Sequence, residues 1–141
     1  MNDIYWTRIF STFVEGIPAP QGSKRGFSKV GTTKVQLVEA STRVKPWREA
    51  IAAQAAAEFR GDPLTVPVMV ETLFLFDRPK TATRPYPCTR NEGDLDKLER
   101  AVFDALVMGW VLLDDSLVVE GHSSKRYGGT AGVFVTVHIE N

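Results

Sequence analysis

Carboxylates gather in one stretch of the sequence, which begins at Gly93 and ends at Asp115. Asp94 and Asp96 flank the expected start of a helix, and Asp114-Asp115 follows that helix after a glycine turn and a short apolar run. Magnesium takes hard oxygen ligands, usually one or two carboxylates together with waters and phosphate oxygens. If the apolar run returns the chain toward the helix start, aspartates from separate segments meet there. This pattern predicts a magnesium site.

A basic residue lies among these acids. Asp96, Arg100 and Asp104 are spaced four residues apart, which places them on one face of the expected helix. A purely structural interpretation also remains open at this point. Asp94 or Asp96 could cap the helix, Asp96 with Glu99 resembles a capping box, and the charges could form surface ion pairs worth about 0.3–0.5 kcal/mol each.

Other chemistries have little support in the residues. The two histidines, His122 and His138, and the single cysteine, Cys88, have no zinc-ligand spacing. A glycine-rich phosphate loop followed by Lys-Ser or Lys-Thr is absent from the sequence, so we expect no nucleotide cofactor. A lone cysteine allows no internal disulfide, which suits a reducing cytoplasm.

Charge is distributed unevenly along the chain. The totals balance, with 17 basic and 17 acidic residues, which counts mildly against nucleic-acid binding. Residues 20–48 nevertheless carry seven Lys or Arg against Glu39, residues 78–90 carry four and no acid, and residues 92–120 carry eight acids against two. One region could hold phosphates while another binds metal. Alternatively, these are solvated faces that do not adjoin in space.

The elements that must position these residues follow from hydrophobic periodicity and from Gly and Pro. We expect a single α/β domain over residues 1–141, bordering on α+β, with a mixed sheet and two main helices. Nothing in the sequence resembles a signal peptide or a membrane span, so a cytoplasmic protein is expected. The expected strands are residues 4–15, 35–40, 66–76, 117–119 and 133–139, the helices are 47–60 (after Pro46) and 95–108, and the long loops are 16–33 and 77–93.

Three segments together resemble the RusA family of Holliday junction resolvases. They are the stretch GDLDKLERAVFDAL from Gly93, the stretch LLDDSLVVE that contains Asp114-Asp115, and the late KRYGG. The Pro-rich, basic stretch GIPAPQGSKR from Gly16 is similar to the N-terminal loop of that family. These motifs occur in the family's order over most of the chain, so their combination is more specific than any one of them.

The resemblance implies a homodimeric, Mg²⁺-dependent endonuclease of bacterial or prophage origin, with Mn²⁺ as a substitute metal. Its substrate would be branched DNA, in particular the four-way junction of recombination and repair. Asp94, Asp96 and Asp115 match the family's catalytic metal ligands, and Arg100 and Lys125 would neutralise charge at the scissile phosphate. Basic residues of the N-terminal loop would hold flanking phosphates: Lys24, Arg25 and Lys29.

Two positions depart from the family pattern. Lys97 stands where the family has Asn, and Arg100 stands where it has a Lys that is important for catalysis. An Arg has a planar guanidinium with donors in fixed directions, whereas a Lys has a mobile point charge, so we expect the exchange to affect catalysis. The alternative functions are a catalytically weakened, non-enzymatic branched-DNA-binding protein and an interaction protein whose aspartates serve as caps and ion pairs.

Overall fold

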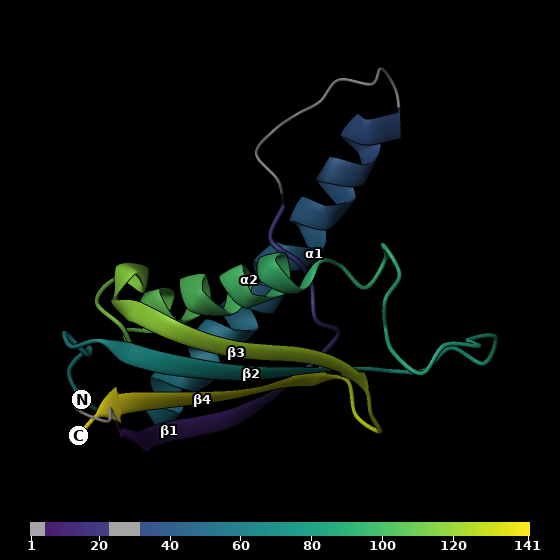
Figure 1. The fold of residues 1–141 in the computed structure, drawn as a ribbon. Coiled ribbons are helices and arrows are strands. Elements are labelled where there is room, and N and C mark those ends of the chain that lie inside the picture. The colour runs from purple at the N-terminus through teal and green to yellow at the C-terminus, as the bar shows by residue number, and fades with distance from the viewer. Residues whose placement is uncertain (1–4, 23–31) are drawn as a thin grey trace.

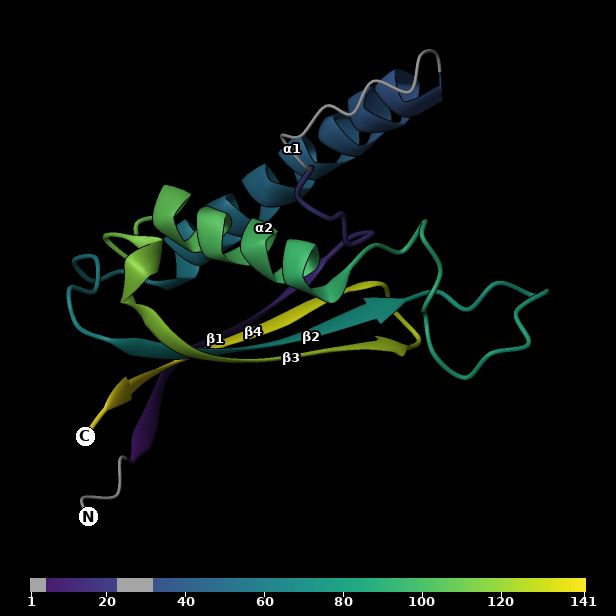
Figure 2. The ribbon, with the colours of Figure 1, turned by 45° about the horizontal axis from the view of Figure 1, so that its top comes forward.

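In the part of the chain that the structure describes, a four-stranded sheet carries two helices on one of its faces and none on the other (Figures 1 and 2). The structure is a computed structural model that describes residues 5–22 and 32–141, with the backbone alone for 32–41. The strands are β1 (Trp6–Glu15), β2 (Val68–Phe76), β3 (Val118–Tyr127) and β4 (Gly132–Glu140). The helices are α1 (Thr32–Glu58) and α2 (Leu95–Met108), and a short 3₁₀ turn, η1 (Asp115–Leu117), precedes β3.

The strand order is β1-β4-β2-β3, which makes the sheet mixed. β4 is antiparallel to both of its neighbours, whereas β2 and β3 are parallel. Parallel strands need a crossover connection, and α2 supplies it. Consequently the chain enters α2 from the carboxyl end of β2 and leaves α2 toward the amino end of β3, at the opposite end of the strands.

The core lies between the sheet and the helices. Phe74 of β2 and the residues Leu98, Val102 and Leu106 of α2 are fully buried. The three helix residues are spaced four residues apart and form the apolar stripe that a helix presents to a sheet. Burying such side chains stabilises the fold by about 1.5–3 kcal/mol each, which fixes α2 over the sheet.

A chain of hydroxyl and carboxylate groups links α2 to the sheet at a polar point. The hydroxyl of Thr72, on β2, donates to Ser123 Oγ on β3 at 2.8 Å, and the Ser123 hydroxyl donates to the Glu99 carboxylate on α2. Thr72 is almost fully buried, so these bonds satisfy groups that would otherwise destabilise the core. The Glu99 bond adds a polar contact to the apolar packing that fixes the rotation of α2, and this rotation leaves Asp96 and Arg100 exposed.

The expected mixed sheet with two helices is confirmed, and two local predictions are wrong. Residues 35–40 were expected to form a strand but lie within α1, because Gln, Leu, Glu and Ala in that stretch are good helix formers. Pro46 was expected to begin a helix and instead lies inside α1. Val44 and Trp47 on either side of Pro46 are buried, so packing offsets the lost backbone hydrogen bond. β3 is also longer than residues 117–119.

Within the described ranges, no helix is long and apolar enough to cross a membrane.

Candidate active site

The first turn of α2 exposes two carboxylates. Asp94 occupies the N-cap position, but its side chain makes no capping hydrogen bond and is 70% exposed. Asp96 is exposed in the first turn. The positive end of the helix dipole favours ionised carboxylates here. The capping box suggested by Asp96 and Glu99 is not formed, since the carboxylate of Glu99 accepts from Ser123 instead. Both aspartates therefore remain available to a ligand.

Lys125 reaches the same place from β3. Because β3 runs back along α2, its last residues lie beside the first turn of the helix (Figure 2). The Lys125 ammonium donates to the carbonyl oxygen of Gly93 at 2.8 Å. Lys97 adds a second cation, 3.6 Å from the Asp94 carboxylate. Carboxylates and ammonium groups thus lie together at the carboxyl ends of the parallel strands β2 and β3.

Gly93 makes this turn possible. Its φ of +95° lies in a region that residues with a side chain rarely adopt, and an added Cβ would lie 2.7 Å from Pro20 Cγ. The close contact joins the Pro18–Gln21 loop to the start of α2. Gln21 N–H then donates to the Lys97 carbonyl at 3.0 Å, and Arg48 Nη1 donates to Gln21 Oε1 at 3.0 Å. The basic residues Lys24, Arg25 and Lys29 follow this loop in the sequence and lie outside the described residues.

The carboxylate of Glu92 is hydrogen-bonded beside the turn at Gly93. Partial burial opposes ionisation of Glu92, but hydrogen bonds from the Thr89 hydroxyl and backbone and from Tyr127, together with the charge of Lys125, hold its pKa below the usual value. Glu92 is accordingly a charged partner for Lys125. It belongs to the support of the site, and its place in the sequence gave no sign of this role.

Asp115 lies at the other end of α2. It lines a shallow depression together with Arg48, Asp104, Asp114 and the apolar end of the helix. Asp96 and Asp104 are eight residues apart, so about 12 Å of helix separates them along the axis. The expectation that the chain returns to the helix start before Asp115 is wrong within one chain. The parallel pairing of β2 and β3 is the reason, because the crossover starts at the carboxyl end of β2 and finishes at the amino end of β3.

The two neighbouring aspartates differ in their surroundings. The backbone N–H of Ser116 donates to Asp114 at 3.0 Å, and this bond is the main cause that lowers the pKa of Asp114. Asp114 thus caps η1, as the turn interpretation suggested. Asp115 has a raised pKa because of its hydrogen bond with Asp114, its burial, and the negative charges of Asp114 and Asp104. A cation near Asp115 would relieve this repulsion.

Two basic residues accompany the acids along α2. Arg100 is exposed and, among the described side chains, forms no ion pair with Asp96 or Asp104. The interpretation of these three residues as mutual ion pairs is therefore wrong. Arg48 of α1 lies between the two ends of α2, since it bonds Gln21 at one end and lines the depression of Asp115 at the other. In the sequence, Arg48 stood out only as part of a basic stretch.

The carboxylates of one chain do not form a closed metal site. Within the described ranges, no three Asp, Glu, His or Cys side chains lie close enough together to hold a metal ion. The exposed pair Asp94 and Asp96 nevertheless fits Mg²⁺, which often takes two carboxylates and completes its shell with water and phosphate oxygens. The structure thus offers two of the three predicted ligands, Asp94 and Asp96, at one place and Asp115 at another.

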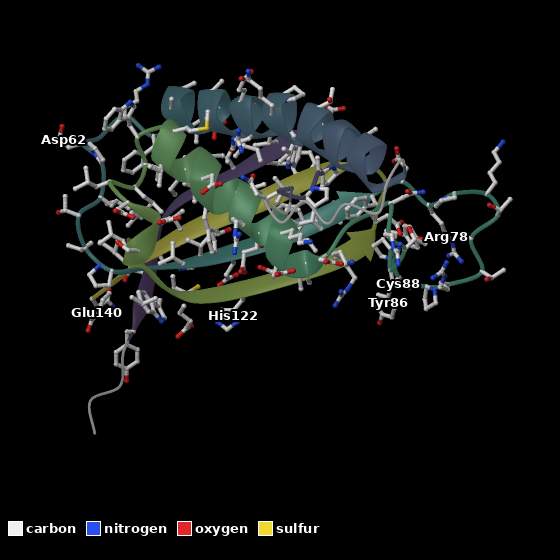
Figure 3. All side chains as sticks on the ribbon, turned by 90° about the horizontal axis from the view of Figure 1, so that it is seen from above. Asp62, Arg78, Tyr86, Cys88, His122 and Glu140 are labelled. Carbon is white, nitrogen blue, oxygen red and sulfur yellow. The ribbon has the colours of Figure 1, made fainter. Side chains whose placement is uncertain are left out.

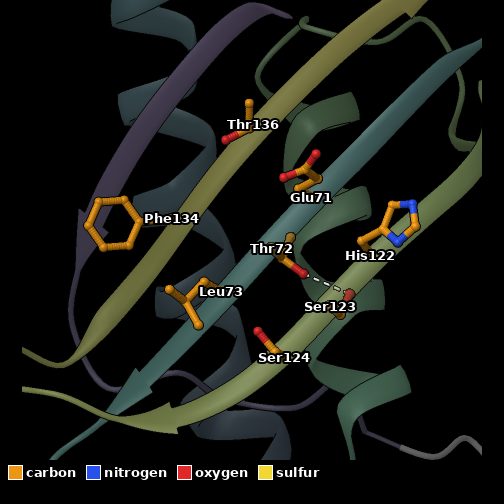
Figure 4. A pocket seen from close by; sticks show the side chains of 8 residues that line it. All are labelled: Glu71, Thr72, Leu73, His122, Ser123, Ser124, Phe134 and Thr136. Carbon is orange, nitrogen blue, oxygen red and sulfur yellow. Dashed lines mark hydrogen bonds between the residues drawn. The ribbon is translucent and has the colours of Figure 1, made fainter. Parts of the chain in front are cut away.

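The histidines lie on the strands of the sheet, His122 on β3 and His138 on β4, and Figure 4 shows His122 on the face away from the helices. His122 Nε2 is 2.8 Å from Glu120 Oε2, and His138 Nε2 is 3.3 Å from Glu71 Oε1. Figure 4 shows Glu71 and His122 on neighbouring strands, around a shallow pocket that Phe134 and Thr136 also line. Among the described residues, these side chains make no group of three metal ligands.

Comparison with known proteins identifies one family. A family model described as endodeoxyribonuclease RusA matches residues 15–138, which spans both ends of α2 and all of β3. A search of curated proteins found no match. The matched region contains every residue of the candidate site, from the Pro18–Gln21 loop to Lys125.

Proposed function

The chain belongs to the RusA family of endodeoxyribonucleases, and from this premise we propose that it resolves Holliday junctions by paired, Mg²⁺-dependent hydrolysis of phosphodiesters. Family membership implies endonuclease action on branched DNA, and nucleases of this family are metal-dependent. The proposal adds the identity of the metal, the residues that act, and a two-fold dimer that cuts twice.

The separation of the carboxylates along α2 carries the proposal. Asp94 and Asp96 lie at the first turn of the helix, and Asp115 lies beside Asp104 near its last turns. A site that uses all three carboxylates would need a second copy of the chain to bring the halves together. A two-fold interface is isologous, so a contact between the start of one α2 and the end of the other occurs twice. Such a dimer would contain two equivalent sites.

Exposed apolar side chains beside Asp115 support this arrangement. Trp110 is 65% exposed and has a φ of +61°, a conformation that costs a residue with a side chain about 1–3 kcal/mol. Met108 and Leu113 are also about half exposed and lie next to it along the chain. Exposed apolar patches on soluble proteins mark interaction sites. A second copy that covers this patch would bring its own Asp94 and Asp96 toward Asp115.

Two sites match the substrate. A four-way junction has approximate two-fold symmetry and needs one incision in each of two strands of like polarity. A dimer with two equivalent sites can make both incisions while bound once. This correspondence favours the dimer over a monomer that must rebind between cuts.

Each residue has a chemical role in the proposed reaction. Asp94, Asp96 and the partner's Asp115 would hold Mg²⁺, and Mn²⁺ can take the same ligands. When bound, the metal supplies Lewis acidity that activates water and offsets charge on the phosphate. Lys125 and Arg100 would neutralise the negative charge that develops on the phosphate and the leaving oxygen. Lys24, Arg25 and Lys29 would hold flanking phosphates without reading bases.

A branched-DNA-binding protein with weakened chemistry is the second candidate, because Arg100 replaces the family's Lys. One assay separates the candidates: a labelled four-way junction and a linear duplex of the same sequence are incubated with the protein and Mg²⁺. Symmetric nicks in the junction alone support the resolvase. Binding without nicks indicates the binding protein, and neither binding nor cutting contradicts both.

A further inference from the structure

The long loop of residues 77–93 carries a set of cations and an exposed aromatic ring beyond the end of the sheet (Figure 3). Its exposed basic residues are Arg78, Lys80, Arg84 and Arg90, and its acids, Asp77 and Glu92, stand near its two ends. Tyr86, in the middle of the loop, is 53% exposed. We infer that Tyr86 and Arg126 form a stacking platform for an unpaired DNA base at the branch point, an inference that rests on the proposed function.

Two arginines already lie against aromatic rings at this surface. The guanidinium carbon of Arg126, at the end of β3, lies 5.1 Å from the centroid of the Tyr86 ring. Arg78 lies 5.8 Å from the centroid of the Tyr127 ring. Guanidinium groups favour the electron-rich face of such rings. The pair Tyr86 and Arg126 therefore joins the loop to β3 and holds the tyrosine in place.

The same arginines have capacity left for an anion. Arg78 and Arg126 each donate one hydrogen bond to a backbone carbonyl, and Arg84 Nη1 lies 3.5 Å from the sulfur of Cys88. Among the described residues, none of the three is paired with a carboxylate. Each guanidinium has five N–H donors, so most of them remain free for phosphate oxygens.

The platform adjoins the proposed scissile centre. Arg126 directly follows Lys125, whose ammonium is bonded to Gly93 beside Asp94. Successive side chains of a strand point to opposite faces, so Lys125 can face the carboxylates while Arg126 faces the loop. Tyr86 and Arg126 therefore lie on the other face of β3 from Lys125, and a strand whose phosphate lies at Asp94 and Lys125 would reach them around the end of β3.

Branched DNA supplies the group that this surface fits. In a continuous duplex every base is stacked on both sides, whereas the bases at a branch point can lose a stacking neighbour. An aromatic ring with nearby cations recovers that stacking for any base, because every base has a π face. An acidic peptide would use the cations but would leave the exposed part of the tyrosine ring uncovered. The platform would therefore favour branched over linear DNA without reading sequence.

Binding in EDTA, where no cutting occurs, tests the inference. The probes are a four-way junction with a fluorescent adenine analogue at its branch point and a linear duplex that carries the analogue internally. Tyr86→Leu should weaken junction binding by about ten-fold and abolish the fluorescence change at the branch point. Binding to the duplex should change by less than about two-fold, because the phosphate contacts remain. Tyr86→Phe keeps the ring and should behave as the unmodified chain does.

A matched control is Tyr5→Leu, which removes a tyrosine that is 63% exposed beside the start of β1 and the end of β4, at the other end of the sheet. It should leave both affinities and the fluorescence unchanged. Equal losses of affinity for junction and duplex with Tyr86→Leu, or no loss, would overturn the platform. This binding result is independent of catalysis. A chain that shows the Tyr86 effect but never cuts with Mg²⁺ refutes the proposed function and supports the platform. A chain that cuts the junction but shows no Tyr86 effect supports the proposed function and refutes the platform.

Discussion

The side chain of Lys125 is bonded to the carbonyl oxygen of Gly93, 32 residues earlier in the chain, at 2.8 Å. This hydrogen bond attaches the end of β3 to the turn that presents Asp94. It also places an ammonium group beside the proposed metal ligands, where it can serve either the turn or the phosphate.

Lys125→Met removes the ammonium and keeps most of the side-chain volume. If the charge stabilises the transition state, the rate of junction cutting at saturating Mg²⁺ should fall by about 100-fold, while affinity for the junction changes little. The melting temperature of the variant separates this role from support of the turn. A large drop in melting temperature with normal cutting would contradict the catalytic role.

Gly93→Ala should disturb the same turn through the backbone. The new methyl group would lie 2.7 Å from Pro20 Cγ at a φ of +95°. We expect a decrease of about 2 kcal/mol in the free energy of unfolding, measured by urea titration, and slower cutting. Gly129→Ala is the control, since a Cβ at Gly129 meets no atom within 4 Å. Equal stability of the two variants would show that the packing of the turn against the Pro18–Gln21 loop is unimportant.

Arg100→Ala tests whether this arginine replaces the family's lysine. Arg100 is exposed and, among the described side chains, is not paired with Asp96 or Asp104, so its guanidinium can meet a phosphate. The cutting rate should fall at every Mg²⁺ concentration, and Arg100→Lys should restore most of it. Complete rescue of Arg100→Ala by high Mg²⁺ would instead assign Arg100 to the support of the metal ligands.

The paired substitution of Lys24 and Arg25 by Ala should weaken binding to all junction sequences alike. A cation that binds a phosphate releases a counterion, so the slope of log affinity against log salt should flatten by about one unit for each phosphate that is no longer bound. A measurement of junction affinity at several salt concentrations gives the slope. An unchanged slope would indicate that this loop does not touch DNA.

Much of the architecture could be predicted from periodicity, because α2 has a clear apolar stripe and β2 is a mainly apolar run between Pro67 and Pro79. The start of α2 at Leu95 and the exposure of Asp94 and Asp96 followed from the same pattern. The prediction of a strand at residues 35–40 was wrong because a short stretch with mixed apolar and polar residues fits either a strand or a helix. Its continuation into α1 decides the outcome.

The position of Asp115 depended on topology. In a parallel pair, the β-to-α connection and the α-to-β connection lie at opposite ends of the strands. Asp94 and Asp115 are therefore separated once β2 and β3 pair in parallel. Strand order is not readable from one sequence, and neither is the stacking of Arg126 on Tyr86. Both arise from long-range pairing that leaves no local signal in the residue types.

We propose that one active site takes Asp94 and Asp96 from one chain and Asp115 from its partner. Asp96→Asn and Asp115→Asn should each abolish cutting by the corresponding homodimer, while junction binding survives because a negative charge near DNA is removed. The decisive measurement uses the mixed dimer of these two variants, isolated through two different affinity tags.

With shared sites, the mixed dimer contains one intact site and one that lacks both carboxylates. We expect it to nick the labelled junction in one strand only, at about half the initial rate of the unmodified dimer, which has two equivalent sites. The mixed dimer of Asp94→Asn with Asp96→Asn is the control and should remain inactive, because each of its sites lacks one ligand. A mixed dimer of Asp96→Asn with Asp115→Asn that binds the junction and makes no nick would contradict the shared site.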